Sequence, residues 1–460
     1  MTKEVGGTMP LTGGGPVMMR LALRGGDYNC HGAGLFGLNF NEQRTIQSRN
    51  VGFRPALAPT RRKPCGQGRT DGTGAKGGRS LPGAKRGNNS APARQVAQAN
   101  TARGHLFEKV ENMPKTARNL WPRVLEWENL LTAAREASRN KRYRREVMAF
   151  NARMEENLLH IRHLLRVREW KPGPYREFEV FEPKRRVVHA PAFADRVVHH
   201  ALVQVIGPYF ERRFIAQSFA CRVNKGTHAA SECLSAMLRS AEAAGAVYVL
   251  KADVTKYFYS IDHDILLRIV ARTIGDKDVL NVLRVLVKES GCITGNRGLP
   301  LGALTSQLLA NVYLDQLDHF IKDTLGVRYY VRYMDDFVLL HHDKAELWRL
   351  LAEIRDFLAY ELHLTLNNKT RVFPASHGVD FAGYRHWASH KLPRKRNVRR
   401  ARKRFAGLSR RYADGRVSID TVRCCVASFV GYMKHCKGWK SAESTLNNLI
   451  LVKNGEKDKE

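Results

Sequence analysis

Hydrophobic and polar positions along residues 105–460 follow two periodicities. In some segments apolar side chains recur every three or four residues, which is the spacing of an amphipathic helix. In others, short runs of β-branched and aromatic residues predict strands. The predicted helical segments are 105–170, 195–214, 264–290, 297–325 after its Gly/Pro loop, 344–363, 393–411 and 417–436. The predicted strands are 177–183, 246–253, both halves of 328–340, 364–373 and 379–387.

From residue 246 onward these elements follow the order β-α-β-β-α-β, which predicts an α+β fold. In that topology the first and third strands lie side by side at the centre of the sheet. The end of strand 246–253 would then meet the turn of hairpin 328–340. Both places carry carboxylates, because Asp253 closes the strand and Asp335 and Asp336 lie between the two runs of the hairpin.

Three carboxylates that converge repel one another unless a cation lies between them. Oxygen ligands suit a hard divalent cation such as Mg²⁺, and two such ions about 3.5–4 Å apart are the catalysts of nucleotidyl transfer. Each position also has a structural interpretation: Asp335 and Asp336 could form a surface turn, and Asp253 could cap the next helix. The presence of all three in the predicted topology favours a metal site.

The charge balance indicates the class of partner. Lys and Arg number 77 against 43 Asp and Glu, and the formal net charge of +34 is typical of proteins that bind a polyanion. Ten of the basic residues and no acidic residue lie in 393–411, a predicted helix that would repel itself without phosphates nearby. The basic segment 139–146 fits RNA contact and a solvated helix face equally well.

Other features restrict the compartment and the kind of site. The eight cysteines include no CxxC pair, which argues against a zinc ribbon or a disulfide framework and suits a reducing cytoplasm. No apolar run reaches the roughly 18 residues of a membrane span, and the N-terminus lacks the pattern of a signal peptide. His199 and His200 point in different directions on a helix, which favours packing or RNA contact over metal binding.

Residues 1–104 differ in composition from the rest of the chain. They hold 20 of the 37 glycines and 16 basic residues, but only 4 acidic ones. Residues 61–104 have almost no large apolar side chains, so they are predicted to be a disordered basic linker. The stretch 21–57 is richer in apolar residues and ends in NVGFRPAL.

The motifs resemble, in order, those of reverse transcriptases. YMDD at 333–336, between two apolar strands, is similar to their central motif, and KADVTKYFYSIDHDIL at 251–266 to their first aspartate motif. Residues 298–318 resemble their Gly-loop helix, and NNKT at 367–370 and DFAGYR at 380–385 resemble their later palm motifs. The resemblance covers about 105–440 and implies an RNA-directed DNA polymerase with a right-hand fold.

The implied divisions of the chain follow from that fold. They are a variable-repeat, C-type-lectin-like stretch at 1–60, the linker at 61–104, fingers at 105–248, a palm with the β-α-β-β-α-β sheet at 249–388, a helical thumb at 389–445 and a tail at 446–460.

The Gly loop indicates a subfamily. Group II intron and retron enzymes usually carry Gln where Leu301 stands, and they end the loop in Ser-Pro, whereas this loop reads LGALTSQ over 301–307. That form, together with 175–202 and ACRVNKGTHAA at 220–230, resembles the reverse transcriptases of diversity-generating retroelements. Those enzymes copy a template-repeat RNA, misincorporate opposite adenines, and supply the cDNA that replaces a variable repeat in a target gene. Their usual residue at position 301 is Ile, so Leu301 is a mild departure.

The resemblance also implies roles for individual residues. Asp253, Asp335 and Asp336 match the metal ligands. Val254, next to Asp253, is also expected at the metal site. Lys369 matches a proposed general acid for pyrophosphate, and a surface salt bridge is its alternative. The residues expected at the dNTP and the templating base are the steric gate Phe258, the triphosphate-binding Lys184 and Arg186, and Leu301, Gly302, Gln307, Tyr333 and Met334. Alternatively, Lys184 and Arg186 only keep the edge of a strand soluble. Nucleic-acid contacts are expected from Arg394, Lys395, Arg396, Arg399, Arg400, Arg402, Lys403 and Arg404.

The implied cofactors are two Mg²⁺ ions, with Mn²⁺ as the alternative. The implied partners are the template-repeat RNA, the RNA/cDNA duplex, dNTPs and a pentameric accessory variability protein, and no membrane is expected. The implied localisation is the cytoplasm, for a protein encoded by a bacterium, an archaeon or a phage. Because NVGFRPAL resembles the end of C-type-lectin-like target proteins, residues 1–104 are interpreted as a translated template repeat, and a genuine accessory domain is the alternative. Two other functions stay open: a group II intron- or retron-like enzyme, and a non-catalytic RNA-binding protein.

Overall fold

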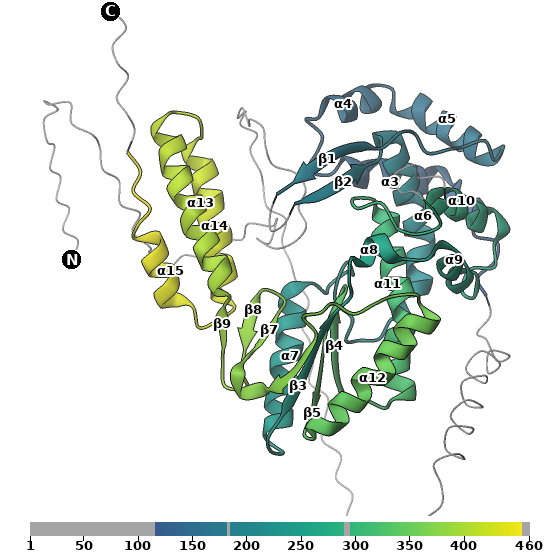
Figure 1. Cartoon of the computed structure of the whole chain (residues 1–460). Helices are drawn as coiled ribbons and strands as arrows, with labels where there is room; N and C mark the ends of the chain where they lie inside the picture. Colours follow the sequence, from purple (N-terminus) through teal and green to yellow (C-terminus); the bar gives the residue numbers. More distant parts are fainter. Residues whose placement is uncertain (1–115, 182–184, 289–294, 453–460) are drawn as a thin grey trace, which may run out of the picture. The chain divides into compact units, whose positions relative to one another are not determined.

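A computed structural model describes residues 116–181, 185–288 and 295–452, which form an α+β fold (Figure 1). The first part is mainly helical, as the periodicity over 105–170 predicts for the residues described. Its elements are α2 (Trp121–Val124), α3 (Trp127–Ser138), α4 (Arg145–Ala152), α5 (Met154–Arg166), the hairpin β1 (Arg176–Val180) and β2 (Arg186–Ala190), α6 (Phe193–Glu211) and α7 (Thr227–Glu242).

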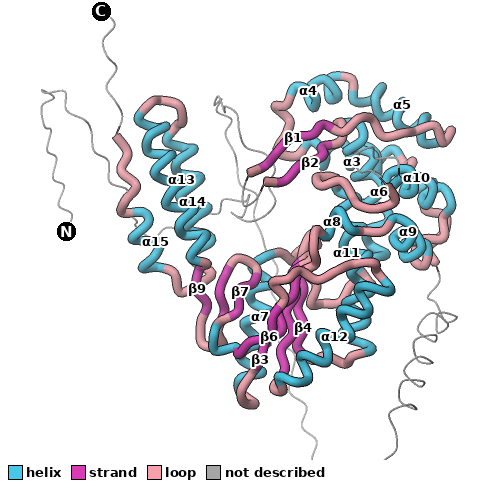
Figure 2. Tube along the Cα trace, viewed as in Figure 1, coloured by secondary structure: helices cyan, strands magenta, loops and turns pink. Residues whose placement is uncertain are grey.

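A four-stranded antiparallel sheet lies at the centre of the next part (Figure 2). Its strand order is β4 (Tyr329–Tyr333), β5 (Asp336–His341), β3 (Tyr248–Asp253) and β6 (Arg371–Pro374). The first and third of these strands along the chain, β3 and β5, are therefore neighbours, as the β-α-β-β-α-β order predicts. Since β6 begins only at Arg371, the predicted strand 364–373 is shorter than expected, and residues 367–370 form a turn.

Both faces of this sheet are buried, which explains the continuous apolar runs in its strands. Leu250, Tyr330 and Leu339 belong to a core shared with α11 (Leu304–His319) and α12 (Lys344–Glu361). The alternating positions Val249 and Val331 belong to a second core with α7 on the opposite face. Figure 1 shows α7 on one side of the sheet and α12 on the other.

Between β3 and β4 the chain forms α8 (Tyr257–Ser260), α9 (His263–Ala271), α10 (Lys277–Lys288), α11 and the π-helix η2 (Phe320–Thr324). The prediction of a single helix over 264–290 is wrong. The Asp276 carboxylate accepts hydrogen bonds from the amides of Asp278 and Val279 and so begins a second helix. Its other oxygen accepts from the amides of Leu120 and Trp121, which ties the break to α2.

After β6 come the 3₁₀ turn η3 (Ala375–His377) and a separate antiparallel sheet of β7 (Val379–Phe381), β8 (Tyr384–His386) and β9 (Lys391–Pro393). The helices α13 (Lys395–Ala413), α14 (Ile419–Lys434) and α15 (Trp439–Leu446) follow and share a third core. No helix in the described parts of the chain is both long and apolar enough to cross a lipid bilayer.

Candidate active site

Two strand ends bring the predicted carboxylates together. Asp253 closes β3 and faces Asp336, the first residue of β5, across the antiparallel pair. Asp335 lies in the two-residue turn between β4 and β5, and its carbonyl accepts a hydrogen bond from the amide of Val254 at 3.2 Å. The turn is formed by Met334 and Asp335 rather than by the two aspartates, so Asp336 already belongs to the strand. Lys256 precedes α8, so Asp253 does not cap that helix.

The surroundings of Asp335 disfavour its charged form. Burial, followed by the negative charges of Asp253 and Asp336, raises the pKa of Asp335 to about 7, although Arg186 acts in the opposite direction. Arg186 begins β2, so the cation whose charge acts on Asp335 comes from a distant hairpin through the tertiary fold.

The other two carboxylates accept hydrogen bonds from neighbouring side chains, one of which is a cation. Lys251, two residues before Asp253 on the same strand face, places its Nζ 2.6 Å from Oδ1 of Asp336. Asn367 donates its backbone amide to the carbonyl of Asp253 at 2.7 Å and its side-chain amide to Oδ2 at 3.3 Å. The turn 367–370 is thereby attached to the end of β3.

These carboxylates fit a divalent cation in part. Asp253 and Asp335 offer hard oxygen donors whose mutual repulsion a cation would relieve, and burial together with this repulsion raises the pKa of Asp335. Within residues 116–181, 185–288 and 295–452, no three His, Cys, Asp or Glu side chains converge closely enough to hold a metal alone. Mg²⁺ is commonly held by one or two carboxylates, with substrate phosphates and water completing its shell. Val254 could contribute only a backbone atom.

The loop before α11 packs against β2. The carbonyl of Leu301 accepts a hydrogen bond from the amide of His189 at 2.9 Å, and the Leu301 side chain is buried. Gly302 has a φ of +118°, and a Cβ there would lie 3.0 Å from the carbonyl oxygen of His189. Only glycine tolerates both conditions. Gln307 lies in the first turn of α11 and is half-buried.

Phe258 lies in the short helix α8, directly beyond the end of β3. Its carbonyl accepts from the amide of Leu299 at 2.7 Å, so the loop before α11 is attached to this helix as well. The neighbouring Tyr257 is fully buried and donates its hydroxyl to the carbonyl of Ala310 in α11. The structure thus brings Phe258, Leu301 and Gly302 into one hydrogen-bonded region.

The remaining predicted residues have different environments. Tyr333 ends β4 and is half-buried, whereas Met334 is buried and has a φ of +56°. Lys369 is exposed in the turn that Asn367 attaches to Asp253. Lys184 lies outside the described residues.

The basic helix α13 buries Ala401, Phe405 and Leu408 and exposes most of its cations. Exposed predicted residues are Lys395, Arg396, Arg399, Arg402, Lys403 and Arg404, whereas Arg394 and Arg400 are half-buried. Arg394 also pairs with Asp380 at 3.7 Å. α13 belongs to the third core, which Tyr384 of β8 shares.

His199 is a packing residue. It is buried, its Nδ1 lies 2.7 Å from Oγ1 of Thr305, and burial lowers its pKa to about 3. The contact joins α6 to the first turn of α11. The Thr305 hydroxyl therefore binds His199 and does not cap α11. The N-cap residue of α11 is Ala303, whose side chain cannot accept a hydrogen bond.

Sequence reasoning missed several residues around the carboxylates. Lys251 and Asn367 lie inside quoted motifs without an assigned role, and Arg332 and Asp318 form a buried ion pair under the turn. The signal for Arg332 was a cation inside an otherwise apolar strand, because such a residue is rarely buried without a partner.

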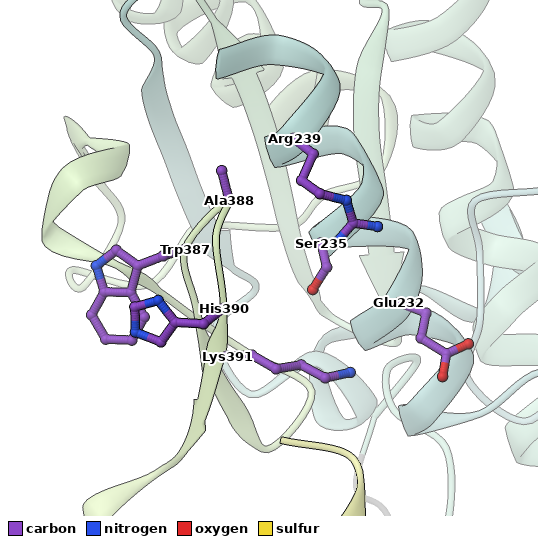
Figure 3. A pocket seen from close by; sticks show the side chains of 7 residues that line it. All are labelled: Glu232, Ser235, Arg239, Trp387, Ala388, His390 and Lys391. Atoms are coloured by element: carbon purple, nitrogen blue, oxygen red, sulfur yellow. The ribbon is translucent and has the colours of Figure 1, made fainter. Parts of the chain in front are cut away.

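A hollow of about 160 Å³ lies between α7 and the β8–β9 connection (Figure 3). Its lining residues are Glu232, Ser235, Arg239, Trp387, Ala388, His390 and Lys391. A second hollow, of about 460 Å³, includes Tyr248, at the opposite end of β3 from Asp253. Neither of these two hollows is lined by a predicted site residue.

A family comparison decides the class of this site. Residues 172–386 match the family model described as reverse transcriptase (RNA-dependent DNA polymerase). The matched residues include Asp253, Asp335 and Asp336, so this site is similar to that of reverse transcriptases. The match assigns RNA-directed DNA polymerase activity, and domains of this kind use divalent metal ions.

Curated relatives agree with the domain. The protein YkfC of Escherichia coli is 27% identical over 288 residues, which is 54% of this chain and 74% of YkfC. The group II intron-encoded protein LtrA of Lactococcus lactis is 26% identical over 176 residues, 36% of this chain and 28% of LtrA. Nuclear intron maturase 1 of Arabidopsis thaliana is 28% identical over 108 residues, 23% of this chain and 14% of the maturase. The chain thus spans less than a third of the two intron-related proteins.

Solved structures give weaker likenesses. A telomerase from Candida albicans has a TM-score of 0.36 at 12% identity, covering 52% of this chain and 51% of that one. A partial Cas6-RT-Cas1–Cas2 complex has a TM-score of 0.33 at 18% identity, covering 53% and 43%. The similarity to reverse transcriptases therefore rests on the sequence match over residues 172–386.

Proposed function

We propose that this chain synthesises cDNA on a template-repeat RNA for a diversity-generating retroelement. The observation that carries the polymerase part is the convergence of Asp253 and Asp335 beside Arg186, at one end of a sheet within the reverse transcriptase domain. The net charge of +34 suits an RNA template and an RNA/cDNA duplex.

In the proposed reaction the 3′-hydroxyl of the growing cDNA attacks the α-phosphorus of a dNTP, and the bond to the β-phosphate breaks. Asp253 and Asp335 would hold the divalent cations, with Mg²⁺ favoured because all the donors are oxygens. Asp336 would be a further ligand once released from Lys251. When bound, these ions lower the pKa of the attacking hydroxyl and stabilise the pyrophosphate.

The other residues position the substrate. Arg186 binds the triphosphate, and Phe258 fills the space that a ribose 2′-hydroxyl would need, which selects dNTPs. Lys369 gives a proton to the departing pyrophosphate. This assignment divides the chain as the sequence predicts, with fingers over 105–248, a palm over 249–388 and a thumb over 389–445, in which α13 binds the duplex through its exposed cations.

A primer-extension assay with Mg²⁺ and dNTPs tests the polymerase, provided that the accessory protein is supplied. Asp335→Asn removes one charge with little change of shape, and we expect it to abolish synthesis. Asp343→Asn is the matched control, because Asp343 caps α12 beyond the opposite end of β5 and asparagine caps equally well. Absence of synthesis by the wild type on any primed RNA contradicts the proposal.

The retroelement part rests on the Gly loop. Leu301 is buried where the loop meets β2, and its side chain offers no hydrogen bond to a base pair. We therefore propose that weak checking of the base pair at this loop lowers fidelity opposite adenines. Leu301→Gln is expected to reduce errors at adenines in sequenced cDNA, with Leu299→Gln as a control in the same loop. An unchanged error spectrum rejects the role of Leu301.

The intron-encoded relatives favour a second candidate, a reverse transcriptase of a group II intron. The two candidates predict different RNAs. The retroelement enzyme binds a template-repeat RNA together with a pentameric accessory protein, whereas the intron enzyme binds and promotes splicing of its own intron. Sequencing of RNA that copurifies with the chain from its native host separates them. The N-terminal interpretation, a translated template repeat, lies outside the described residues and is tested by mass spectrometry of the native N-terminus.

A further inference from the structure

A charged side chain is fully buried directly beneath the turn that carries Asp335. Arg332, on β4, is 0% exposed and projects to the face of the sheet that α11 covers. Arginine is rarely buried without partners, because removing its charge from water costs several kcal/mol. The partners of Arg332 therefore indicate which part of the structure the buried charge stabilises.

One side of the guanidinium is occupied by Asp318 of α11. Nε lies 2.7 Å from Oδ1, and Nη2 lies 2.5 Å from Oδ2, which is the two-point geometry of a strong ion pair. The hydroxyl of Tyr330 donates to Oδ1 of the same carboxylate at 2.6 Å. Asp318 is also fully buried, so neither charge is shared with solvent.

The remaining nitrogen reaches the catalytic turn. Nη1 of Arg332 donates to the carbonyl of Met334 at 2.9 Å and approaches Oδ1 of Asn311 at 3.3 Å. Met334 has a φ of +56°, a conformation that costs a residue with a Cβ free energy. A hydrogen bond to its carbonyl favours this conformation over relaxed alternatives, and the next residue along the chain is Asp335.

The backbone of Arg332 is fixed as well. Its amide donates to the carbonyl of Gln217 at 3.0 Å, and its carbonyl accepts from the amide of Phe219 at 3.1 Å. Since Asn311 and Asp318 lie on one face of α11, seven residues apart, both can orient the guanidinium from a single rigid helix.

We infer that Arg332 is a positioning residue that holds the Met334–Asp335 turn in the geometry that catalysis requires. Stability alone does not explain the ion pair, because apolar residues of similar volume commonly replace a buried pair without loss. What they cannot replace is the N–H group directed at the Met334 carbonyl. The inference rests on the proposed polymerase function of the same site.

The test separates positioning from folding. Arg332→Met/Asp318→Leu removes the whole ion pair, so its melting temperature is expected to remain near that of the wild type. Active sites are counted by the burst amplitude of single-nucleotide extension, and the rate is measured per active site. We expect the rate to fall about 100-fold, with unchanged affinity for primer–template. A double variant with normal burst rate would overturn the inference.

Two further variants keep the test decisive if the double variant folds poorly. Arg332→Lys retains a charge for Asp318 but lacks the fork that also reaches Met334, and it is expected to show the same loss of rate at a temperature where circular dichroism is native. Arg196→Met is the control. Arg196 of α6 makes a half-buried ion pair with Glu146 of α4 at 2.7 Å, which also tests the loss of an arginine from an ion pair. It is expected to lose stability and keep its rate per active site.

Each remaining outcome has a meaning. If Arg332→Lys lowers only the burst amplitude, the residue contributes to folding alone and the inference fails. If the wild type itself makes no cDNA, the proposed function fails first, and that result is recognised before any variant is compared.

Discussion

Lys251 and Asp336 form an ion pair inside the carboxylate cluster, with Nζ of the lysine 2.6 Å from Oδ1 of the aspartate. Both side chains are largely shielded from solvent, at 19% and 29% exposure. The three aspartates of the site are therefore not equivalent. Asp336 is paired with a cation of the protein, whereas Asp335 has a pKa that burial, followed by the charges of Asp253 and Asp336, raises.

This relationship predicts that Lys251→Met increases the demand of the site for a cation. Without the lysine, Asp336 adds its full negative charge to the cluster, so Mg²⁺ is attracted more strongly. We expect primer extension to reach half its maximal rate at a lower Mg²⁺ concentration. We also expect Mg²⁺ to raise the melting temperature more than in the wild type.

Lys288→Met is the control for this prediction, because Lys288 pairs with Asp264 at 2.8 Å in an exposed ion pair away from the sheet. It should leave both Mg²⁺ titrations unchanged. An unaltered titration for Lys251→Met, in protein that is folded, would show that the lysine does not control the charge of the site.

The raised pKa of Asp335 predicts a pH dependence of stability. Burial and the neighbouring aspartates move this pKa from 3.8 to about 7 in the folded chain. Between these values the folded state holds a proton that the unfolded state has released, so the free energy of unfolding falls as pH rises through this window. Above about pH 7 the loss is complete.

Thermal melting in EDTA from pH 5 to pH 8 measures this effect. We expect the wild type to lose more stability across the range than Asp335→Asn, whose side chain does not titrate. Mg²⁺ should reduce the difference, since a cation favours the charged carboxylate. Parallel curves for the two proteins would mean that Asp335 titrates normally.

The close approach of Gly302 to β2 predicts that an alanine there destabilises the fold by a steric clash, and Gly295 serves as the matched control. Its φ is +118°, and an alanine Cβ would lie 3.0 Å from the carbonyl oxygen of His189 and 3.1 Å from Cγ1 of Val188. Gly295 has a φ of +91° and nothing within 4 Å of the same position. Backbone strain alone should cost either alanine variant about 1–3 kcal/mol.

We therefore expect urea unfolding to show a larger loss for Gly302→Ala than for Gly295→Ala. Gly302→Ala should also raise KM for dNTPs, because the loop moves away from β2 and Leu301 moves with it. Equal losses of stability and equal KM values would indicate that the close approach of the loop to β2 has no role.

The contact between α14 and the β7–β8 turn predicts a separable effect on processivity. The Tyr432 hydroxyl donates to the carbonyl of Gly383 at 2.6 Å, and the Tyr384 hydroxyl donates to the carbonyl of Tyr432 at 3.0 Å. Tyr432→Phe removes the first bond and also the bond that the hydroxyl accepts from Nδ2 of Asn397 at 3.1 Å, each worth about 0.5–1.5 kcal/mol. Shorter cDNA products are expected, with an unchanged rate for the first nucleotide.

Tyr412→Phe is the control, since Tyr412 packs against the same apolar core from α13. Product lengths are read on a denaturing gel with a trap that prevents rebinding. If Tyr432→Phe slows the first nucleotide as much as later ones, the contact supports the site itself rather than the grip on the duplex.

Much of the sheet could be predicted because its signals are local. Alternation and β-branched residues identify β3, β4 and β5, and the order of elements places β3 beside β5. The position of Asp253 at the end of a strand and of Asp335 in a turn follows from the same pattern. The break between α9 and α10 was missed because the capping of α10 by Asp276 coincides with a contact to α2, more than 150 residues away in the chain.

The sequence by itself determined most of the helices and strands, the pairing of β3 with β5 and the convergence of the carboxylates at their ends. Only the tertiary structure decided that Lys251 pairs with Asp336, that Arg186 lies near Asp335 and that Arg332 finds Asp318 beneath the turn. The reason is physical: periodicity depends on neighbours in the chain, whereas the partner of a charge depends on strand register and on which helices exclude water from each face.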